Sequence, residues 1–385
     1  MQKLLVVHNF YQNFGGEDSN IYEEINFLSK EYEIEFFDAK NEANISFFSL
    51  LALFTRNNFR MNSKFLKILN NFKPDIVYIH NLWFTINLGI FPILKKKKVH
   101  TIVKIHNFRY ECSRYLFSRT HLKGQLTCDA CGFSKNTNLL FNKYFSESYL
   151  KSFFLYLFSK KLFNILKSYP LSIVAISIFH RSQLIKSGLN ENKISIFHNP
   201  IKLNLDKNIK KSKYFVYAGR LSIEKGVEEL ILAWINSGLQ DYQLLIIGEG
   251  ELKNYLQSKY TNHNIKFLGF LPNNKVMEYI KSASAVISAT KLYEGQPRLL
   301  CEASSFGTLS IYPSFGSMDE FFPNNYKFSF KQFDYEDLKN KIKLTQDFKT
   351  VKSSTDELLN FSKKIFDPSK FYYEFSKLIQ NKDQK

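Results

Sequence analysis

Residues 216–226 read Val-Tyr-Ala-Gly-Arg-Leu-Ser-Ile-Glu-Lys-Gly, and an apolar pattern with helical spacing follows them. The apolar run that ends at Gly219 predicts a buried strand, and the glycine marks the start of a turn. Arg220 and Lys225 both lie in this turn. Ligands of a parallel α/β sheet bind outside the carboxyl ends of its strands, where an arginine fork and a lysine point charge suit a diphosphate. Taken alone, an ordinary basic loop explains this stretch better, so the neighbouring stretches decide its interpretation.

Two further stretches repeat the passage from strand to helix. Residues 244–250 read Leu-Leu-Ile-Ile-Gly-Glu-Gly, an apolar run that ends in a turn containing Gly248 and Gly250. Residues 267–272 read Phe-Leu-Gly-Phe-Leu-Pro and precede a helical segment that contains Val276. A lone Gly-x-Gly is weak evidence, but strands that alternate with helices in this way predict a parallel sheet.

A pair of carboxylates follows in residues 294–302, which read Glu-Gly-Gln-Pro-Arg-Leu-Leu-Cys-Glu. If the whole stretch were helical, eight steps would separate Glu294 from Glu302 by roughly 12 Å. Two carboxylates that act on one anomeric carbon need about 5–9.5 Å. The spacing therefore suits a grip on a long ligand at two points. The alternative is a pair of solvated glutamates near a helix start, where negative charge is favoured.

The order of these motifs between residues 216 and 320 resembles that of the family 4 (group 1) retaining glycosyltransferases, which have the GT-B fold. The resemblance includes Gly-Arg-x4-Lys-Gly at residues 219–226 and Glu-x7-Glu at residues 294–302, and it continues to Gly316 and Glu320. It implies an α/β protein in which two Rossmann-like domains face each other across a cleft.

The resemblance also implies roles for individual residues. Arg220 and Lys225 would bind the donor diphosphate, Glu294 the sugar hydroxyls and Glu302 the ribose. His106, at the end of a strand, would lie near the reacting sugar and complete the catalytic set. The implied donor-binding residues are Gly219, Gly248, Gly250, Pro272, Val276, Gly295, Gln296, Pro297, Arg298, Leu299 and Glu302.

The first half of the chain is expected to bind the acceptor. Gly15 and Gly16 follow the first strand, and such a loop lets backbone amides approach a phosphate or a sugar. A plain flexible turn is an equally good interpretation of these glycines. His80 ends the neighbouring strand and is a weaker candidate than His106, which could itself be an ordinary packed histidine.

The chain of 385 residues with 44% hydrophobic content predicts two domains. We expect residues 1–201 to form the N-terminal domain, with a cysteine-bearing loop at 106–135, and residues 202–213 to be a linker. Residues 214–367 would form the nucleotide-sugar domain. The terminal helix at 368–385 would cross back to the N-terminal domain, as the resemblance implies. Strands are predicted near 3–8, 33–37, 76–80, 101–105, 172–176, 194–197, 214–218, 243–247, 265–268, 284–288 and 308–312.

Charge is distributed unevenly along the chain. Residues 1–42 hold 3 lysines and arginines against 9 carboxylates, whereas residues 43–186 hold 22 against 4. A basic region of this size indicates an anionic partner. The segment 144–169 interleaves lysines with aromatic residues, which suits a membrane headgroup layer. We expect Phe154 and Phe158 to face that layer. The alternatives are a core helix with solvated lysines and nucleic-acid binding, but no nucleic-acid motif is present.

Four cysteines in a chain of this length do not indicate a disulfide framework. Cys112, Cys128 and Cys131 are close in sequence, and His121 could complete a structural zinc site. Free thiols and a disulfide are the alternatives. Cys301 falls at the expected donor site.

The resemblance therefore implies a metal-independent, retaining hexosyltransferase-type enzyme that requires no cofactor for catalysis. It would move a sugar from a nucleotide-diphosphate sugar to a lipid-linked or polysaccharide acceptor in cell-surface glycan synthesis. No stretch predicts a transmembrane helix or a signal peptide, so we expect a cytoplasmic protein, peripheral on the inner face of the cytoplasmic membrane. The rival interpretations are a sugar-nucleotide epimerase with the GT-B fold and a basic membrane-binding protein with an inactive transferase fold.

Overall fold

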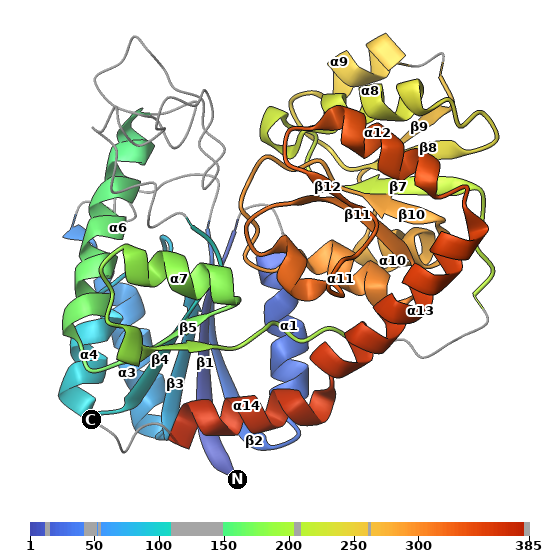
Figure 1. Cartoon of the computed structure of the whole chain (residues 1–385). Helices are drawn as coiled ribbons and strands as arrows, with labels where there is room; N and C mark the ends of the chain where they lie inside the picture. The colour runs from blue at the N-terminus through green and yellow to red at the C-terminus, as the bar shows by residue number, and fades with distance from the viewer. Residues whose placement is uncertain are drawn as a thin grey trace. The chain divides into compact units, whose positions relative to one another are not determined.

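The computed structural model describes residues 1–11, 16–41, 52, 55–108, 149–203, 209–260 and 263–380. The chain forms two compact units (Figure 1). The first unit comprises Met1–Pro200 together with Phe371–Lys385, and the second comprises Ile201–Lys370. The first unit is therefore discontinuous in sequence, and the chain passes between the units twice.

The first unit contains a six-stranded parallel sheet with the order β2-β1-β3-β4-β5-β6. Its strands are β1 (Gln2–Phe10), β2 (Tyr32–Lys40), β3 (Ile76–Asn81), β4 (His100–Ile105), β5 (Ser172–Ala175) and β6 (Ile194–Ile196). Its described helices are α1 (Gly16–Leu28), α3 (Phe59–Phe72), α4 (Ile90–Lys97), α6 (Tyr149–Ser168), α7 (Ile178–Lys186), the 3-10 turn η1 (Glu191–Lys193) and α14 (Pro368–Gln380).

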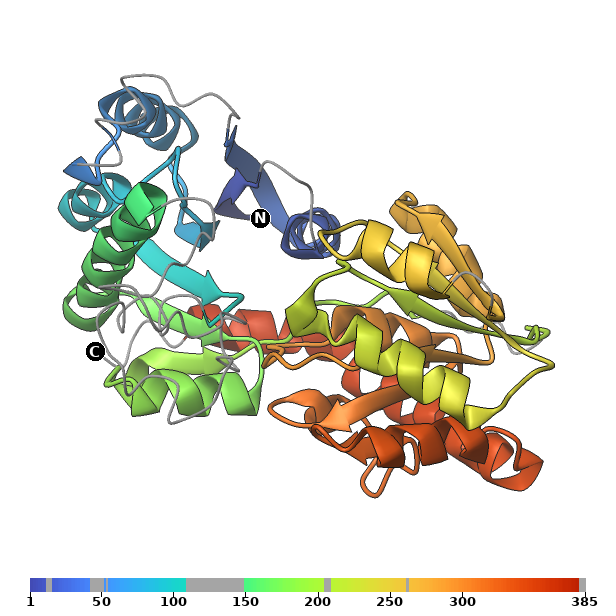
Figure 2. The ribbon, with the colours of Figure 1, turned by 90° about the horizontal axis from the view of Figure 1, so that it is seen from above.

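Successive residues of these strands point to opposite faces of the sheet, and both faces are apolar. Leu5 and Val7 of β1 face a core that includes residues of α3, α4, α6 and α7. Leu4 and Val6 face a second core, which includes residues of α1 and α14. The view from above shows α3, α4 and α6 on one side of the sheet and α1 on the other (Figure 2).

The inner face of helix α6 is part of the hydrophobic core. Phe154 and Phe158 are 6% and 5% exposed and pack with Leu155 and Leu166 in the core on the α6 side of the sheet. The expectation that Phe154 and Phe158 face a membrane is therefore wrong. Phe154 and Phe158 are four residues apart, so they lie on one face of the helix. This spacing is the same whether the apolar face covers a sheet or a membrane surface.

Helix α14 belongs to the first unit, although it follows the whole of the second unit in sequence. Phe371 and Phe375 are buried in the core that also contains Leu28. The Tyr372 hydroxyl donates a hydrogen bond of 3.0 Å to the main-chain oxygen of Phe27. The last helix therefore completes one face of the first sheet.

The second unit contains another six-stranded parallel sheet, ordered β12-β11-β10-β7-β8-β9. Its strands are β7 (Tyr214–Ala218), β8 (Gln243–Ile247), β9 (Ile265–Gly269), β10 (Ala285–Ile287), β11 (Leu309–Ser314) and β12 (Ser329–Lys331). Its helices are α8 (Val227–Ser237), α9 (Lys253–Tyr260), α10 (Asn273–Ser282), α11 (Arg298–Ser305), α12 (Tyr335–Leu344) and α13 (Phe348–Ile365). The 3-10 turns are η2 (Ile223–Lys225) and η3 (Met318–Phe321).

The helices of the second unit cover both faces of its sheet. Helix α8 packs against α12, and α11 packs against α10 and α13. Figure 1 shows these two groups on opposite sides of the strands. The prediction of an α/β protein with two Rossmann-like domains is confirmed by the two sheets. No helix among the described residues is long and apolar enough to cross a membrane.

Candidate active site

The turns that follow β7 and β8 are packed directly against each other. Gly248 has a φ of +137°, and a Cβ added there would lie 1.9 Å from the main-chain oxygen of Gly219. A Cβ at Gly250 would lie 2.3 Å from the main-chain oxygen of Leu221. Only glycine fits such close backbone approaches. The Gly-x-Gly turn thus shapes the loop that carries Arg220 and Lys225.

Lys225 is held against the segment that follows β10. Its Nζ lies 2.6 Å from Oε1 of Glu294, and both side chains are about one-quarter exposed, at 25% and 28%. The next residue, Gly226, has a positive φ, and a Cβ there would lie 2.1 Å from the main-chain oxygen of Ala289. The close packing at Gly226 brings the Gly-Arg-x4-Lys-Gly and Glu-x7-Glu motifs together, although 69 residues separate Lys225 from Glu294.

Arg220 has a more open position than Lys225. Its guanidinium lies 3.3 Å from Oε1 of Glu224, and its side chain is 65% exposed. The hydroxyl of Tyr217 donates a hydrogen bond of 2.8 Å to the main-chain oxygen of Arg220 and so fixes the start of the turn. Burial raises the pKa of Tyr217 above its ordinary range, and nearby Glu224 acts in the same direction. Tyr217 is therefore a neutral hydrogen-bond donor at neutral pH.

The two glutamates of the Glu-x7-Glu element lie on different kinds of backbone. Helix α11 begins at Arg298, so Glu294 precedes the helix and Glu302 lies within it. The separation of roughly 12 Å calculated for a continuous helix does not apply, because the first four residues of the stretch are not helical. Oε1 of Glu302 accepts a hydrogen bond of 2.7 Å from Nε of Arg298, and both side chains are largely buried.

Other predicted donor-site residues occupy the same edge of the second sheet. Gly295, Gln296 and Pro297 join Glu294 to α11, where Leu299 is half-buried. Pro272 is the N-cap residue of α10, and Val276 in the first turn of that helix is buried in the core. Near it, the Phe270 amide donates a hydrogen bond of 3.2 Å to Glu249.

Sequence reasoning missed Ser317. Its hydroxyl donates a hydrogen bond to the main-chain oxygen of Glu294, so the segment before η3 helps to fix the loop that carries this carboxylate. The sequence signal is weak, because Ser317 lies between the two matched residues Gly316 and Glu320 but is not itself part of the resemblance. The thiol of Cys301 is buried on the inner side of α11, and burial raises its pKa well above the ordinary value of cysteine. Cys301 therefore lies in the core and is protonated at neutral pH.

In the first unit, His106 forms part of a buried histidine pair. Nε2 of His106 lies 2.8 Å from Nδ1 of His80, and the two rings are stacked. Burial lowers the pKa of both rings well below the ordinary value of histidine, and Lys104 and His8 act in the same direction. Both rings are therefore neutral at neutral pH. The sequence ranked His80 below His106, whereas the structure joins the two.

Two buried pairs of polar side chains lie near this histidine pair. Nε2 of His8 lies 2.9 Å from Oδ1 of Asp18, with both side chains fully buried. Nζ of Lys104 lies 3.1 and 2.9 Å from the two carboxylate oxygens of Glu24, which also accepts a hydrogen bond of 2.8 Å from Tyr78. These groups attach α1 to β1, β3 and β4. The signal for Lys104 was a lysine inside an apolar strand, which requires a buried partner.

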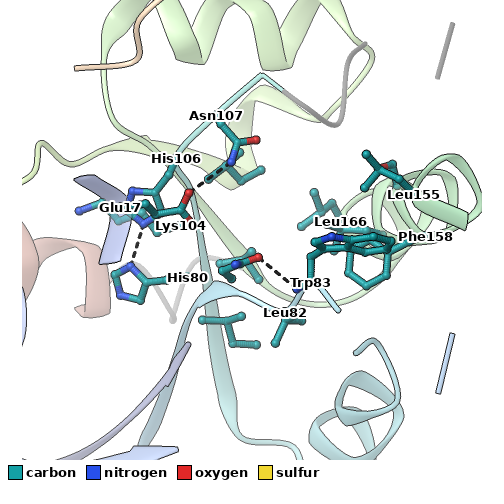
Figure 3. Close-up of a pocket in the computed structure, with 16 residues that line it drawn as sticks. Glu17, His80, Leu82, Trp83, Lys104, His106, Asn107, Leu155, Phe158 and Leu166 are labelled. Carbon is teal, nitrogen blue, oxygen red and sulfur yellow. Dashed lines mark hydrogen bonds between the residues drawn. The ribbon is translucent and has the colours of Figure 1, made fainter. Parts of the chain in front are cut away.

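A cavity of about 80 Å³ lies beside the histidine pair, on the side of α6. Figure 3 shows His80, His106, Asn107 and Glu17 on one side and the apolar side chains that include Trp83 and Phe158 on the other. Gly16 begins α1 near this edge. Gly15, Cys112, His121, Cys128 and Cys131 lie outside the described residues, so the predicted zinc site remains a prediction. Within the described ranges, no group of three or more potential ligands could hold a metal ion.

Residues 202–347 match the family model described as glycosyl transferases group 1. This match lies within the second unit. Because the two sheets have the architecture of the solved structures described below, the fold is the GT-B fold.

Curated relatives carry related names. The chain is 34% identical over 122 residues to the amylovoran biosynthesis glycosyltransferase AmsD of Erwinia amylovora, a match to 31% of this chain and 34% of the relative. It thus spans about a third of the length of AmsD. It is 24% identical over 317 residues to an α-1,4-N-acetyl-D-galactosaminyltransferase of Campylobacter jejuni, a match to 79% of this chain and 77% of that relative. The name of that relative gives a diNAcBac-PP-undecaprenol-linked glycan as its acceptor.

Solved structures share the fold over the whole chain. Anabaena Alr3699/HepE in complex with UDP and glucose superposes with a TM-score of 0.68 at 13% identity, covering 99% of this chain and 100% of that one. Sucrose-phosphate synthase from Thermosynechococcus elongatus gives a TM-score of 0.71 at 12% identity, covering 99% and 98%. At such low identity these likenesses establish the fold alone.

Proposed function

We propose that this protein is a family 4 retaining glycosyltransferase that needs no metal ion for catalysis. It would transfer a sugar from a nucleotide-diphosphate sugar to a lipid-linked or polysaccharide acceptor in cell-surface glycan synthesis. The observation that carries this proposal is the contact of 2.6 Å between Lys225 and Glu294 at the carboxyl ends of the strands in the second unit. The names of the relatives from Erwinia and Campylobacter support the link to glycan synthesis, and HepE was solved with UDP-glucose.

In the proposed donor site, cations bind the diphosphate of the donor and carboxylates bind its two sugars. Arg220 and Lys225 are placed on one turn, where both can meet the charge that develops on the leaving diphosphate. Glu294 is proposed to bind sugar hydroxyls, and its contact with Lys225 would hold the two groups together before the donor binds. Glu302, which pairs with Arg298, is proposed to bind the ribose.

The proposed reaction breaks the bond between the anomeric carbon and the diphosphate oxygen. The acceptor hydroxyl attacks that carbon from the face that the diphosphate leaves, and its proton passes to the departing phosphate oxygen. No protein nucleophile is required in this scheme. The two cations are proposed to supply the electrostatic stabilisation that a metal ion supplies in other transferases.

We further propose that the first unit binds the anionic inner surface of the cytoplasmic membrane, through basic residues rather than through the aromatics of α6. Lys95, Lys96, Lys97 and Lys98 are exposed at the end of α4. Helix α3, which contacts α4, adds exposed Lys64 and Lys67 and an exposed Phe59. Each lysine near an anionic leaflet contributes about 1 kcal/mol of binding.

A thermal-shift screen with UDP-, GDP- and ADP-sugars tests the donor proposal. A ligand that binds the folded state at 100 times its Kd stabilises it by about 2.7 kcal/mol, so one nucleotide class should raise the melting temperature. The effect should disappear in Arg220→Ala and Lys225→Ala. Stabilisation by no nucleotide sugar, or equal stabilisation of both variants, would contradict the proposed site. Interconversion of sugar nucleotides without an acceptor would favour the epimerase.

A further inference from the structure

The cavity beside the histidine pair combines a polar side with an apolar side. Its apolar lining comes from β3, β4, the segment after β3, and α6. These apolar residues are Ile79, Leu82, Trp83, Val103, Ile105, Leu155, Phe158, Leu162 and Leu166. The polar lining includes Glu17, His106 and Asn107 (Figure 3). A ligand that fills this cavity must therefore have both hydrogen-bonding and apolar parts.

The charges of the cavity do not suit an anion. Among the described lining residues Lys104 is the one cation, and Glu24 holds its ammonium with both carboxylate oxygens. Because the pKa values of His80 and His106 are lowered by burial, these rings add no positive charge at neutral pH. Glu17 contributes a carboxylate. A neutral group is consequently favoured over a phosphate or a carboxylate.

The size of the cavity limits the group further. Its volume of about 80 Å³ is roughly half that of the 150 Å³ engineered cavity that binds benzene, so it has room for about three or four non-hydrogen atoms. An acetamido group has this size. Its methyl group could lie against Trp83 and Phe158, while the amide could reach the Asn107 and Glu17 side, where Nδ2 of Asn107 lies 3.4 Å from Oε2 of Glu17.

We propose that this cavity binds the acetamido group of an N-acetylated sugar, and that this sugar is the acceptor. The proposal rests on the proposed function only in treating the bound sugar as an acceptor. The cavity itself lies entirely in the first unit and shares no residue with the donor site. The structure thus assigns a substrate class, an acceptor whose sugar carries a short N-acyl branch.

Trp83 provides a direct readout in the full-length protein. The chain has two tryptophans, and Trp234 is buried in the core of the second unit. In a Trp234→Phe background, titration with N-acetylglucosamine or N-acetylgalactosamine should change Trp83 emission saturably. Glucose and galactose should bind at least tenfold more weakly. Equal binding of the acetamido sugars and their parent sugars, or no saturable change with either acetamido sugar, overturns the proposal.

A matched pair of variants on α6 tests the location. Leu162 lines the cavity and Leu157 does not, and both are half-buried. Leu162→Phe should reduce the affinity for the acetamido sugar at least tenfold, whereas Leu157→Phe should leave it within about twofold. Saturation-transfer NMR on wild-type protein should place the strongest contact at the acetamido methyl group. An unchanged affinity in Leu162→Phe overturns the location.

The same preparations separate this inference from the donor proposal. Thermal stabilisation by a nucleotide sugar should persist in Leu162→Phe, because its donor residues are untouched. If a nucleotide sugar binds but acetamido sugars do not, the acceptor inference fails and the proposed transferase stands. If acetamido sugars bind but no nucleotide sugar does, the cavity assignment stands and the transferase proposal fails.

Discussion

The two units use charged side chains in opposite ways. In the first unit, Lys104 and Glu24 form an ion pair that is almost fully buried, with Tyr78 as a further partner. In the second unit, Lys225 and Glu294 form a pair that is partly open to solvent. The charged groups of the buried pair are occupied by each other, whereas a half-open pair can exchange part of its contact for a phosphate or a hydroxyl. In the first unit, buried charges therefore hold α1 against the sheet. In the second unit, accessible charges form the candidate donor site.

The largest expected effect is a loss of unfolding free energy when the buried pair is broken. Glu24→Ala leaves the Lys104 ammonium without its carboxylate, and such a loss typically costs about 3–5 kcal/mol. The measurement is urea unfolding followed by Trp83 in a Trp234→Phe background. The double variant Lys104→Met with Glu24→Leu should recover most of the loss, because it removes both charges together. A loss below about 1 kcal/mol in Glu24→Ala would show that water reaches the pair.

Removing an accessible charge should affect transfer and leave stability nearly unchanged. Arg220→Ala or Lys225→Ala removes a preorganised group from the proposed leaving diphosphate, at a cost of roughly 2–4 kcal/mol in the barrier. The expected loss of rate exceeds tenfold at an unchanged melting temperature. Lys343→Ala, an exposed cation on α12 of the same unit, is the matched control. Retention of more than about a tenth of the rate by both site variants would refute the assignment.

Acid should destabilise the first unit before the second. Burial lowers the pKa of His180 to about 3, so between pH 6.5 and 3 the unfolded chain binds a proton that the folded chain does not. Stability then falls as the pH decreases, by about 2 kcal/mol at pH 5 for this residue. His80 and His106 shift in the same direction.

Trp83 and Trp234 lie in different units, so their separate unfolding curves at pH 7 and pH 5 check this expectation. The first unit holds seven of the eight histidines of the chain. His180→Gln should reduce the pH dependence of the Trp83 transition and leave the Trp234 transition alone. A Trp83 transition that does not change between these pH values would contradict the buried, neutral state of His180.

The smallest effect is expected at the basic surface of the first unit. Lys96→Gln should weaken binding to phosphatidylglycerol vesicles by about 1 kcal/mol at moderate salt, because one charge leaves the surface. Co-sedimentation measures this, with Lys343→Gln in the second unit as the control. Binding should weaken as the Debye length falls from about 10 Å at 0.1 M salt to about 3 Å at 1 M. Equal binding to neutral vesicles would argue against an electrostatic contact.

The sequence was most informative where backbone geometry determines residue type. The strand predicted at 214–218 coincides with β7, and the one at 243–247 coincides with β8. Gly248 and Gly250, which follow β8, are required by close backbone approaches, so a motif could locate them. The short strand β12 (Ser329–Lys331) was missed, because its three residues include a single apolar side chain, that of Phe330.

The sequence was least informative where partners are distant along the chain. Lys104 and Glu24 are 80 residues apart, and His80 and His106 are 26 apart, so no local pattern joins them. Helix α6 shows a related limit. Its aromatic spacing predicts one apolar face, and only the packing of Phe154 and Phe158 shows that this face covers the sheet.

The return of α14 to the first unit has a consequence for synthesis on the ribosome. The second unit is continuous from Ile201 to Lys370, whereas the first unit needs Phe371 and Phe375 to complete its core. Domains usually fold in the order in which they are translated. Here the part translated first must wait for the last part, while the second unit can finish beforehand. We therefore expect nascent chains stalled before residue 371 to hold a protease-resistant second unit and a protease-sensitive first unit.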